Sequence, residues 1–153
     1  MAGEGNLASN SALSTAALNH SRYMNETKEV GHNETHTNAT YYSGNSPSNR
    51  VNNAGYSNIF VGENVSYGQS NFMESINGLM SAIYHRFGFL HLNINEIGAG
   101  KDSNYYTYEM GRNGGVTSPN MVIWPPENAK NIAPVFFDES PDPLPEYRYL
   151  DTQ

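Results

Sequence analysis

The chain has 153 residues, no cysteine and a formal net charge of −7 at pH 7. This length favours one domain whose core is large enough to fold without disulfides. The lack of cysteine excludes thiol catalysis, thiolate zinc sites and disulfide frameworks. The acidic balance argues against nucleic acid or an anionic membrane as the main partner. Only 15% of residues are charged, and the polarity comes mainly from uncharged side chains, which is typical of secreted, periplasmic or cell-surface proteins.

The start of the chain carries no recognisable targeting segment. There is no run of about 18 apolar residues, so the sequence predicts no transmembrane segment. No basic and apolar signal peptide opens the chain either. Met1-Ala2-Gly3 resembles an expression start on a trimmed domain, so we expect the natural signal peptide to be missing from this sequence.

The first predicted helix covers residues 10–28, after a small, polar and flexible lead-in at residues 1–9. Asn10 can cap this helix, and Gly31 is a stop signal just beyond it. One face repeats at helical spacing through Leu13, Ala17, His20 and Met24. A lone histidine on such a face is more often a buried, hydrogen-bonded residue than a ligand, and we expect that of His20.

The segment after this helix alternates polar side chains. His32, Glu34 and His36 would point to one side if the segment is extended. Such a set suits a divalent metal ion or an acid–base pair, and a polar surface loop is the alternative. A surface loop over residues 38–49 and a short helix stopped by Gly55 are expected next.

A carboxylate lies inside the next predicted strand, within residues 60–68. Val61 and Val65 suit a strand, and glycines at 62 and 68 punctuate it. Because an unpaired buried charge is too costly, Glu63 is expected either on an exposed edge or beside partners. His32 before the strand and His85 after it are the candidate partners.

A second long helix is predicted over residues 71–84. Asn71 and Glu74 resemble a capping box, and an apolar stripe follows, formed by Phe72, Ile76, Leu79, Met80 and Ile83. His85 comes just after the stripe, where the helix dipole favours a cationic ring. That structural role competes with a role for His85 in a site.

The last third of the chain changes to the two-residue period of strands. Parts of residues 96–110 and 120–124 are predicted strands, with a turn at 113–115. Residues 127–153 are acidic and rich in proline, so we expect a strap or a linker there. Phe136 and Phe137 would anchor it if it docks.

Several of these segments, in this order, resemble the CAP superfamily of cysteine-rich secretory proteins, antigen 5 and pathogenesis-related proteins, and its bacterial cysteine-free branch most of all. The matching pieces span residues 7–124 and are Ala17–Met24, Gly31–Glu34, Arg50–Tyr56, Gly62–Asn64, Tyr84–Arg86 with Phe89–Leu90, and Glu96–Gly100. The resemblance implies a CAP domain over residues 10–126. It also implies an α+β fold, an α-β-α sandwich whose small central, mainly antiparallel sheet is flanked by helices.

The resemblance further implies a cavity built from two histidines and two glutamates. His32, Glu63 and His85 match three of these positions, while the fourth, late in the second long helix, is unmatched. Glu34 or Glu74 could stand in for it. His32 and His85, with Glu63 as a ligand or a support, could hold zinc or another divalent cation, although no cofactor is expected to be required.

Three functions are compatible with these residues. The resemblance favours a domain that binds a divalent ion, a small polar ligand or an extracellular partner. A peptidase-like hydrolase with Glu63 as general base is the alternative, although no nucleophile motif such as G-x-S-x-G is present. Lipid or sterol binding is a third hypothesis, and no long apolar groove-forming stretch after the second helix supports it.

Overall fold

The computed structural model describes residues 7–115, 124–125 and 127–130. Within them, the elements in chain order are β1 (Ala8–Ser9), α1 (Ser11–Thr27), α2 (Pro47–Asn53), β2 (Ile59–Tyr67), α3 (Phe72–Ser81), α4 (Ile83–Phe89), β3 (Glu96–Asp102) and β4 (Tyr105–Arg112). No helix in the described ranges is both long enough and apolar enough to cross a membrane.

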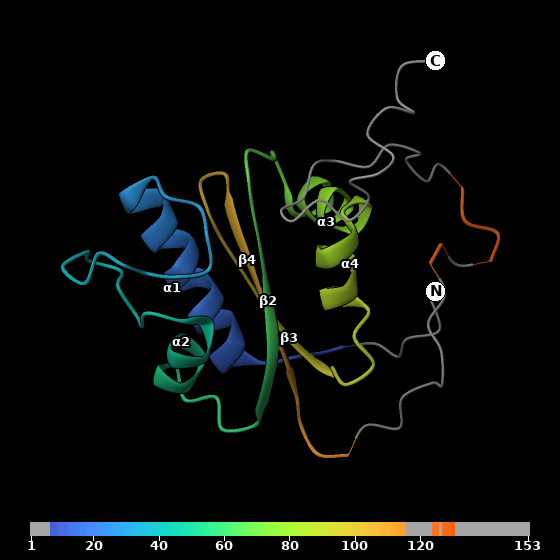
Figure 1. Cartoon of the computed structure of the whole chain (residues 1–153), viewed down its shortest axis with the longest axis horizontal. Helices are drawn as coiled ribbons and strands as arrows, with labels where there is room; N and C mark the ends of the chain where they lie inside the picture. Colours follow the sequence, from blue (N-terminus) through green and yellow to red (C-terminus); the bar gives the residue numbers. More distant parts are fainter. Residues whose placement is uncertain (1–6, 116–123, 126, 131–153) are drawn as a thin grey trace, which may run out of the picture.

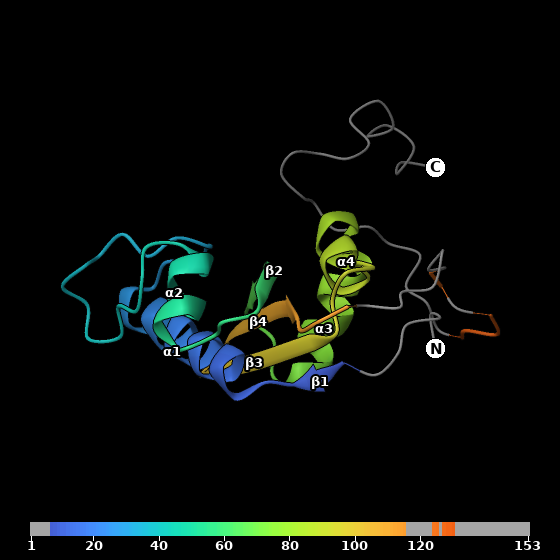
Figure 2. The ribbon, with the colours of Figure 1, turned by 90° about the horizontal axis from the view of Figure 1, so that it is seen from below.

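The strands form one sheet in the order β1-β3-β4-β2 (Figure 1). β1 runs parallel to β3, whereas β4 is antiparallel to both of its neighbours, β3 and β2. Helices α1 and α2 cover one face of the sheet and α3 and α4 the other (Figure 2). The predicted α-β-α sandwich with a small, mainly antiparallel sheet is therefore confirmed, with β2 as an edge strand.

Helix α1 begins as the sequence predicts. The side chain of Asn10 accepts hydrogen bonds from the backbone N–H groups of Ala12 and Leu13, at 2.9 and 3.2 Å. These bonds satisfy donors that the first helical turn would otherwise leave free. The side-chain nitrogen of Asn10 also donates to Glu96 at the start of β3, over 3.1 Å. The cap therefore also fixes α1 against the sheet.

Two glycines let α1 lie directly on β3. A Cβ atom added to Gly98 would meet backbone atoms of Leu13 and Ser14 at 2.2 Å, and one added to Gly100 would meet the backbone of Leu18 at 2.2 Å. Side chains alternate along a strand, so both glycines face the helix. The lack of a side chain at these two positions sets the distance between α1 and the sheet.

The second long helix is broken, although the sequence predicts one helix over residues 71–84. Asn71 and Glu74 form the expected cap, but Ala82 has extended backbone (φ −88°, ψ 129°) and separates α3 from α4. The Arg86 side chain donates to the carbonyls of Met80 and Ser81, over 2.6 and 3.1 Å. These bonds satisfy carbonyls at the end of α3, so the break leaves them with partners.

Other details also differ from the sequence prediction. The hairpin between β3 and β4 turns at Ser103 and Asn104, where Ser103 has positive φ. Ala8–Ser9, assigned to the flexible lead-in, forms strand β1. The predicted strand at 120–124 lies almost wholly outside the described residues. So do the end of the predicted domain at residue 126 and most of the tail, with Phe136 and Phe137.

The close approach of α1 to β3 predicts that one methyl group added at Gly98 destabilises the fold. Gly98→Ala should lower the free energy of unfolding by about 3 kcal/mol, since the backbone of α1 cannot move aside as a side chain could. Gly62→Ala in β2 is the matched control, because an added Cβ there meets nothing within 4 Å, and its effect should stay within about 1 kcal/mol. Urea unfolding measures both. Equal losses in the two variants would contradict this packing.

Candidate functional site

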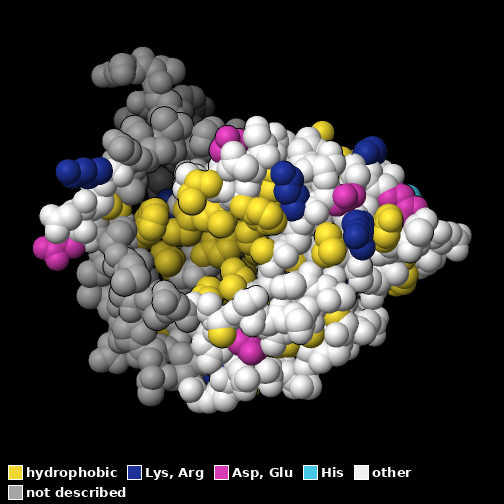
Figure 3. Space-filling view, turned by 180° about the vertical axis from the view of Figure 1, so that it is seen from behind, with side chains coloured by type: hydrophobic (Ala, Val, Ile, Leu, Met, Phe, Trp, Pro, Cys, Tyr) yellow, Lys and Arg dark blue, Asp and Glu magenta, His cyan; other side chains and the backbone are white. Residues whose placement is uncertain are grey.

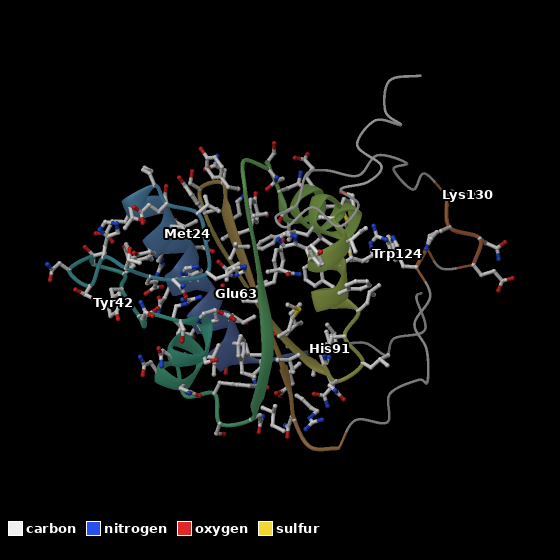
Figure 4. All side chains as sticks on the ribbon, viewed as in Figure 1. Met24, Tyr42, Glu63, His91, Trp124 and Lys130 are labelled. Atoms are coloured by element: carbon white, nitrogen blue, oxygen red, sulfur yellow. The ribbon has the colours of Figure 1, made fainter. Side chains whose placement is uncertain are left out.

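The centre of the candidate site is Glu63, on β2. Its side chain is 1% exposed, and Figure 4 shows it on the side of β2 that faces α1 and α2. One carboxylate oxygen accepts a hydrogen bond from Nδ1 of His32 over 2.8 Å. The other oxygen accepts from Nη2 of Arg50. Of the two expected alternatives for Glu63, an exposed edge or a position beside partners, the structure has the second, with His32 as one partner.

His32 extends from this buried carboxylate toward solvent. Its side chain is 51% exposed, in contrast to Glu63. Nη1 of Arg50 donates to the backbone carbonyl of His32 over 2.9 Å. This bond fixes the backbone of the loop that carries the imidazole. Because Nδ1 faces a carboxylate, Nδ1 carries the proton and donates. In the neutral ring, Nε2 is then left as the hydrogen-bond acceptor.

Arg50 is the cation that holds these parts together. It lies on α2, whose first turn is capped by Ser46 and starts with proline, and its side chain is fully buried. Beyond Glu63, the guanidinium approaches Glu34 (Nε to Oε1, 3.7 Å) and Glu109 (Nη2 to Oε1, 4.0 Å). Arg50 was part of a matching segment in the sequence, but its charge was not recognised as part of the site.

Glu34 belongs to the buried support of the site. It is fully buried, and its carboxylate accepts from the backbone N–H groups of Ser43 (2.6 Å) and Gly44 (3.2 Å) and from Nδ1 of His20 (2.9 Å). Nε2 of His20 donates to the carbonyl of Gly31 over 2.8 Å. Both ring nitrogens of His20 therefore have a hydrogen-bond partner. His20 is therefore buried and hydrogen-bonded, as predicted, and it braces Glu34.

Glu109 is a member of this network that the sequence analysis missed. It lies directly opposite Glu63 in the β2–β4 register and is fully buried. Neither carboxyl oxygen has a hydrogen-bond partner among the described residues. Burial, followed by the negative charge of Glu63, raises the pKa of Glu109 to about 10. Pairing β2 with β4 in the correct register is the signal that would have revealed it.

Glu63 behaves in the opposite way to Glu109. Burial by itself would raise the pKa of the Glu63 carboxyl, but the hydrogen bond from His32 and the positive charge of His20 outweigh it and lower the pKa below the ordinary value. Two carboxyls that face each other across two strands thus have pKa values shifted in opposite directions. At neutral pH, Glu63 carries the charge and Glu109 carries a proton.

His85 is carried by a helix on the opposite face of the sheet from α1 and α2. It lies on α4, and its backbone carbonyl accepts from the side chain of Asn64 over 2.8 Å. Asn64 follows Glu63 in β2, so its side chain points to the opposite face. Glu74 lies at the exposed start of α3, where it accepts from the N–H of Ser70 over 3.0 Å. It therefore has a capping role and does not replace the missing fourth carboxylate.

These placements bear on the expected metal site. The part of the chain that the structure describes contains no group of three or more His, Asp or Glu side chains placed to hold a metal ion. His32 and Glu63 alone do not supply the three protein ligands that a catalytic zinc ion needs. The described residues therefore do not fit a bound zinc ion. What they form is an exposed imidazole fixed on a buried ion pair.

The central position of Arg50 predicts a large loss of stability on its removal. Arg50→Ala should lower the free energy of unfolding by about 3–5 kcal/mol, because it leaves buried carboxylates without their cation. Arg22→Ala on α1 is the control, since that guanidinium lies over the Tyr41 ring (5.4 Å to the centroid) and contributes about 0.5–1 kcal/mol. Chemical denaturation of both variants measures these two losses of stability. Similar losses would show that the buried network contributes little.

The raised pKa of Glu109 predicts a pH dependence of stability. The folded protein keeps the proton up to about pH 10, whereas the unfolded chain releases it near 4.5. The contribution of Glu109 is therefore complete below pH 4.5 and is lost as pH rises toward 10. Glu109→Gln, which mimics the neutral acid, should gain stability relative to the wild type by about 1.4 kcal/mol per pH unit in that window.

Denaturation of wild type and Glu109→Gln at pH 5, 6, 7 and 8 measures this slope. Because the comparison uses the difference between two proteins, the titrations that the substitution leaves unchanged cancel. A constant difference across the four pH values would show that Glu109 is ionised in the fold.

Comparison with known proteins identifies the family to which the chain belongs. The cysteine-rich secretory protein (CAP) family matches residues 1–116. An extracellular protein of Bacillus anthracis that contains an SCP domain has a similar structure, with a TM-score of 0.63 and 20% identity over 70% of this chain and 34% of that protein. An outer surface protein of Borrelia burgdorferi has a TM-score of 0.58 and 14% identity, over 72% of this chain and 80% of that one. No curated protein matches.

This chain spans about a third of the Bacillus protein. The family match covers most of the chain, includes every described helix and strand, and agrees with the resemblance of the short motifs. The chain belongs to the CAP family of cysteine-rich secretory proteins, as a member without cysteine.

Proposed function

We propose that this CAP domain binds a polar ligand or partner through the imidazole of His32. The observation that carries the proposal is the pairing of a half-exposed His32 side chain with an almost fully buried Glu63. Exposed histidines ordinarily rotate freely, and a surface ion pair contributes little. Here the carboxylate is buried and is fixed in turn by Arg50, so the imidazole is held in one orientation before any ligand arrives.

The fixed orientation defines the class of ligand. With Nδ1 donating to Glu63, Nε2 of neutral His32 is the ring atom left for a ligand. As an acceptor, it recognises hydrogen-bond donors such as a hydroxyl, an amide N–H or an ammonium group. A preorganised acceptor costs less entropy on binding than a mobile one. These properties favour hydroxyl-rich or amine-bearing ligands.

The same pair supports a second candidate, a hydrolase. A carboxylate that orients an imidazole, with the second ring nitrogen free, is the arrangement of a general base. The 2.8 Å bond between His32 and Glu63 favours this hypothesis specifically. In it, His32 rather than Glu63 would accept the proton from a water molecule, since Glu63 is buried.

The site of action that we propose is outside the cytoplasm, whether secreted, periplasmic or at the cell surface. The two similar structures are an extracellular protein and an outer surface protein. The low fraction of charged residues in this chain agrees with such a setting.

The ligand hypothesis is tested with a defined set of probes. Monosaccharides, polyols and amino-acid amides are titrated into the isotope-labelled protein, and backbone and imidazole NMR shifts are followed. Probes that bind should shift His32 and its neighbours, and His32→Gln should abolish those shifts without changing the fold. His36→Gln is the matched control, because His36 pairs with Glu29 at 3.0 Å where both side chains are more than half exposed.

Two results distinguish the hypotheses. Shifts at His32 without turnover of a peptide or ester probe would support a binding domain, and turnover lost in both His32→Gln and Glu63→Gln would support a hydrolase. If no probe shifts His32, or if His32→Gln binds as the wild type does, the imidazole is not the contact.

A further inference from the structure

The helices on the two faces of the sheet are offset. Helix α1 packs on β3 and β4, whereas α3 and α4 pack on β2 and on Tyr106 and Tyr108 of β4. Gly98 and Gly100 face α1, so the alternate residues Ile97, Ala99 and Lys101 lie on the other face of β3. Ala99 is exposed and Ile97 only half-buried, even though β3 is an interior strand. This face of β3 lacks the helical cover that its opposite face has.

Apolar side chains continue from this strand to α3. Ala99 and Tyr108 are partners in the β3–β4 register. The ring of Phe72 on α3 meets the rings of Tyr106 and Tyr108 edge-on, at centroid distances of 5.4 and 6.2 Å, yet Phe72 is 40% exposed. We call the area formed by Phe72, Ile76, Ile97 and Ala99 the α3–β3 surface. Figure 3 shows apolar side chains gathered in the middle of the face behind the sheet, where α3 and β3 lie.

The border of the α3–β3 surface carries a positive charge. Nζ of Lys101 lies 5.2 Å from the centre of the Tyr106 ring and donates to the carbonyl of Ser70 over 3.1 Å. An exposed apolar area with a fixed cation at its border suits an apolar segment that is followed by acidic residues.

The chain itself contains such a segment. Val135, Phe136 and Phe137 are followed directly by Asp138 and Glu139. The described residues between 124 and 130 lie on the same side of the sheet as α3 and α4 (Figure 1). Six residues from Lys130 to Phe136 can span roughly 20 Å when extended, and the proline at 134 disfavours a helix. We propose that residues 135–139 dock on the α3–β3 surface of the same chain, with Phe136 and Phe137 against Ile97 and Ala99.

NMR on the full chain tests this docking. Nuclear Overhauser contacts are expected between the rings of Phe136 and Phe137 and the methyl groups of Ile97 and Ala99. A sample that mixes labelled and unlabelled chains separates contacts within one chain from contacts between copies. Contacts only between copies would assign the surface to a dimer, and the absence of any contact would leave it uncovered by this segment. Either result overturns the proposal.

Variants give a second, independent readout. The double variant Phe136→Ser, Phe137→Ser should raise binding of a hydrophobic dye severalfold and lower the melting temperature, whereas the control Tyr149→Ser in the same tail should do neither. Ala99→Glu should have the same effect as the double variant, because it places a negative charge opposite the acidic residues of the tail. Residue 99 is exposed, so the substitution itself should not disturb the fold. Dye binding equal to wild type in both would also overturn the proposal.

Discussion

The architecture of the α1 and α2 side depends on one buried cation, Arg50. A guanidinium without access to water requires negative partners, and it has three carboxyls within 4.0 Å. Each carboxyl comes from a different part of the chain: Glu34 from the loop after α1, Glu63 from β2 and Glu109 from β4. Charge neutralisation therefore helps to fix where α2 and the loop lie relative to the sheet, together with the packing of Val51 against Leu13 and Ala16 of α1.

This arrangement explains how an exposed histidine can be rigid. His32 takes part in this network through two hydrogen bonds, one from its ring to Glu63 and one from Arg50 to its backbone carbonyl. Both end on residues that other bonds already fix. Glu96 has a comparable structural role at the start of β3, where it accepts from Asn10, Tyr56 and Asn58. The scaffold thus uses Glu34, Glu63 and Glu96, each of which accepts hydrogen bonds from more than one residue, to join loops to the sheet.

The sequence was a good guide wherever the determinant is local. Helix caps at Asn10 and Asn71, the periodicity of α1 and the need of Glu63 for partners all depend on residues close together in the chain, and each prediction was correct. The break at Ala82 was missed because it depends on Arg86 bonding back to α3. Glu109 was missed because its importance arises from strand register, which a pattern of alternation alone does not define. His85 could be matched to a motif, but only the fold shows that its helix lies on the opposite face of the sheet from α1 and α2.

The charges of the buried network also restrict what His32 can recognise. Arg50 supplies a positive group, and Glu63, whose pKa is lowered, supplies the negative group that pairs with it. Glu109 adds no charge as long as it keeps its proton, which its raised pKa ensures at neutral pH. The buried network that supports His32 is then close to neutral, so it exerts no strong electrostatic field on a ligand bound at the imidazole. Recognition there would depend on the direction of the hydrogen bond at Nε2 more than on the charge of the ligand, and this favours hydroxyl and amide groups over simple ions.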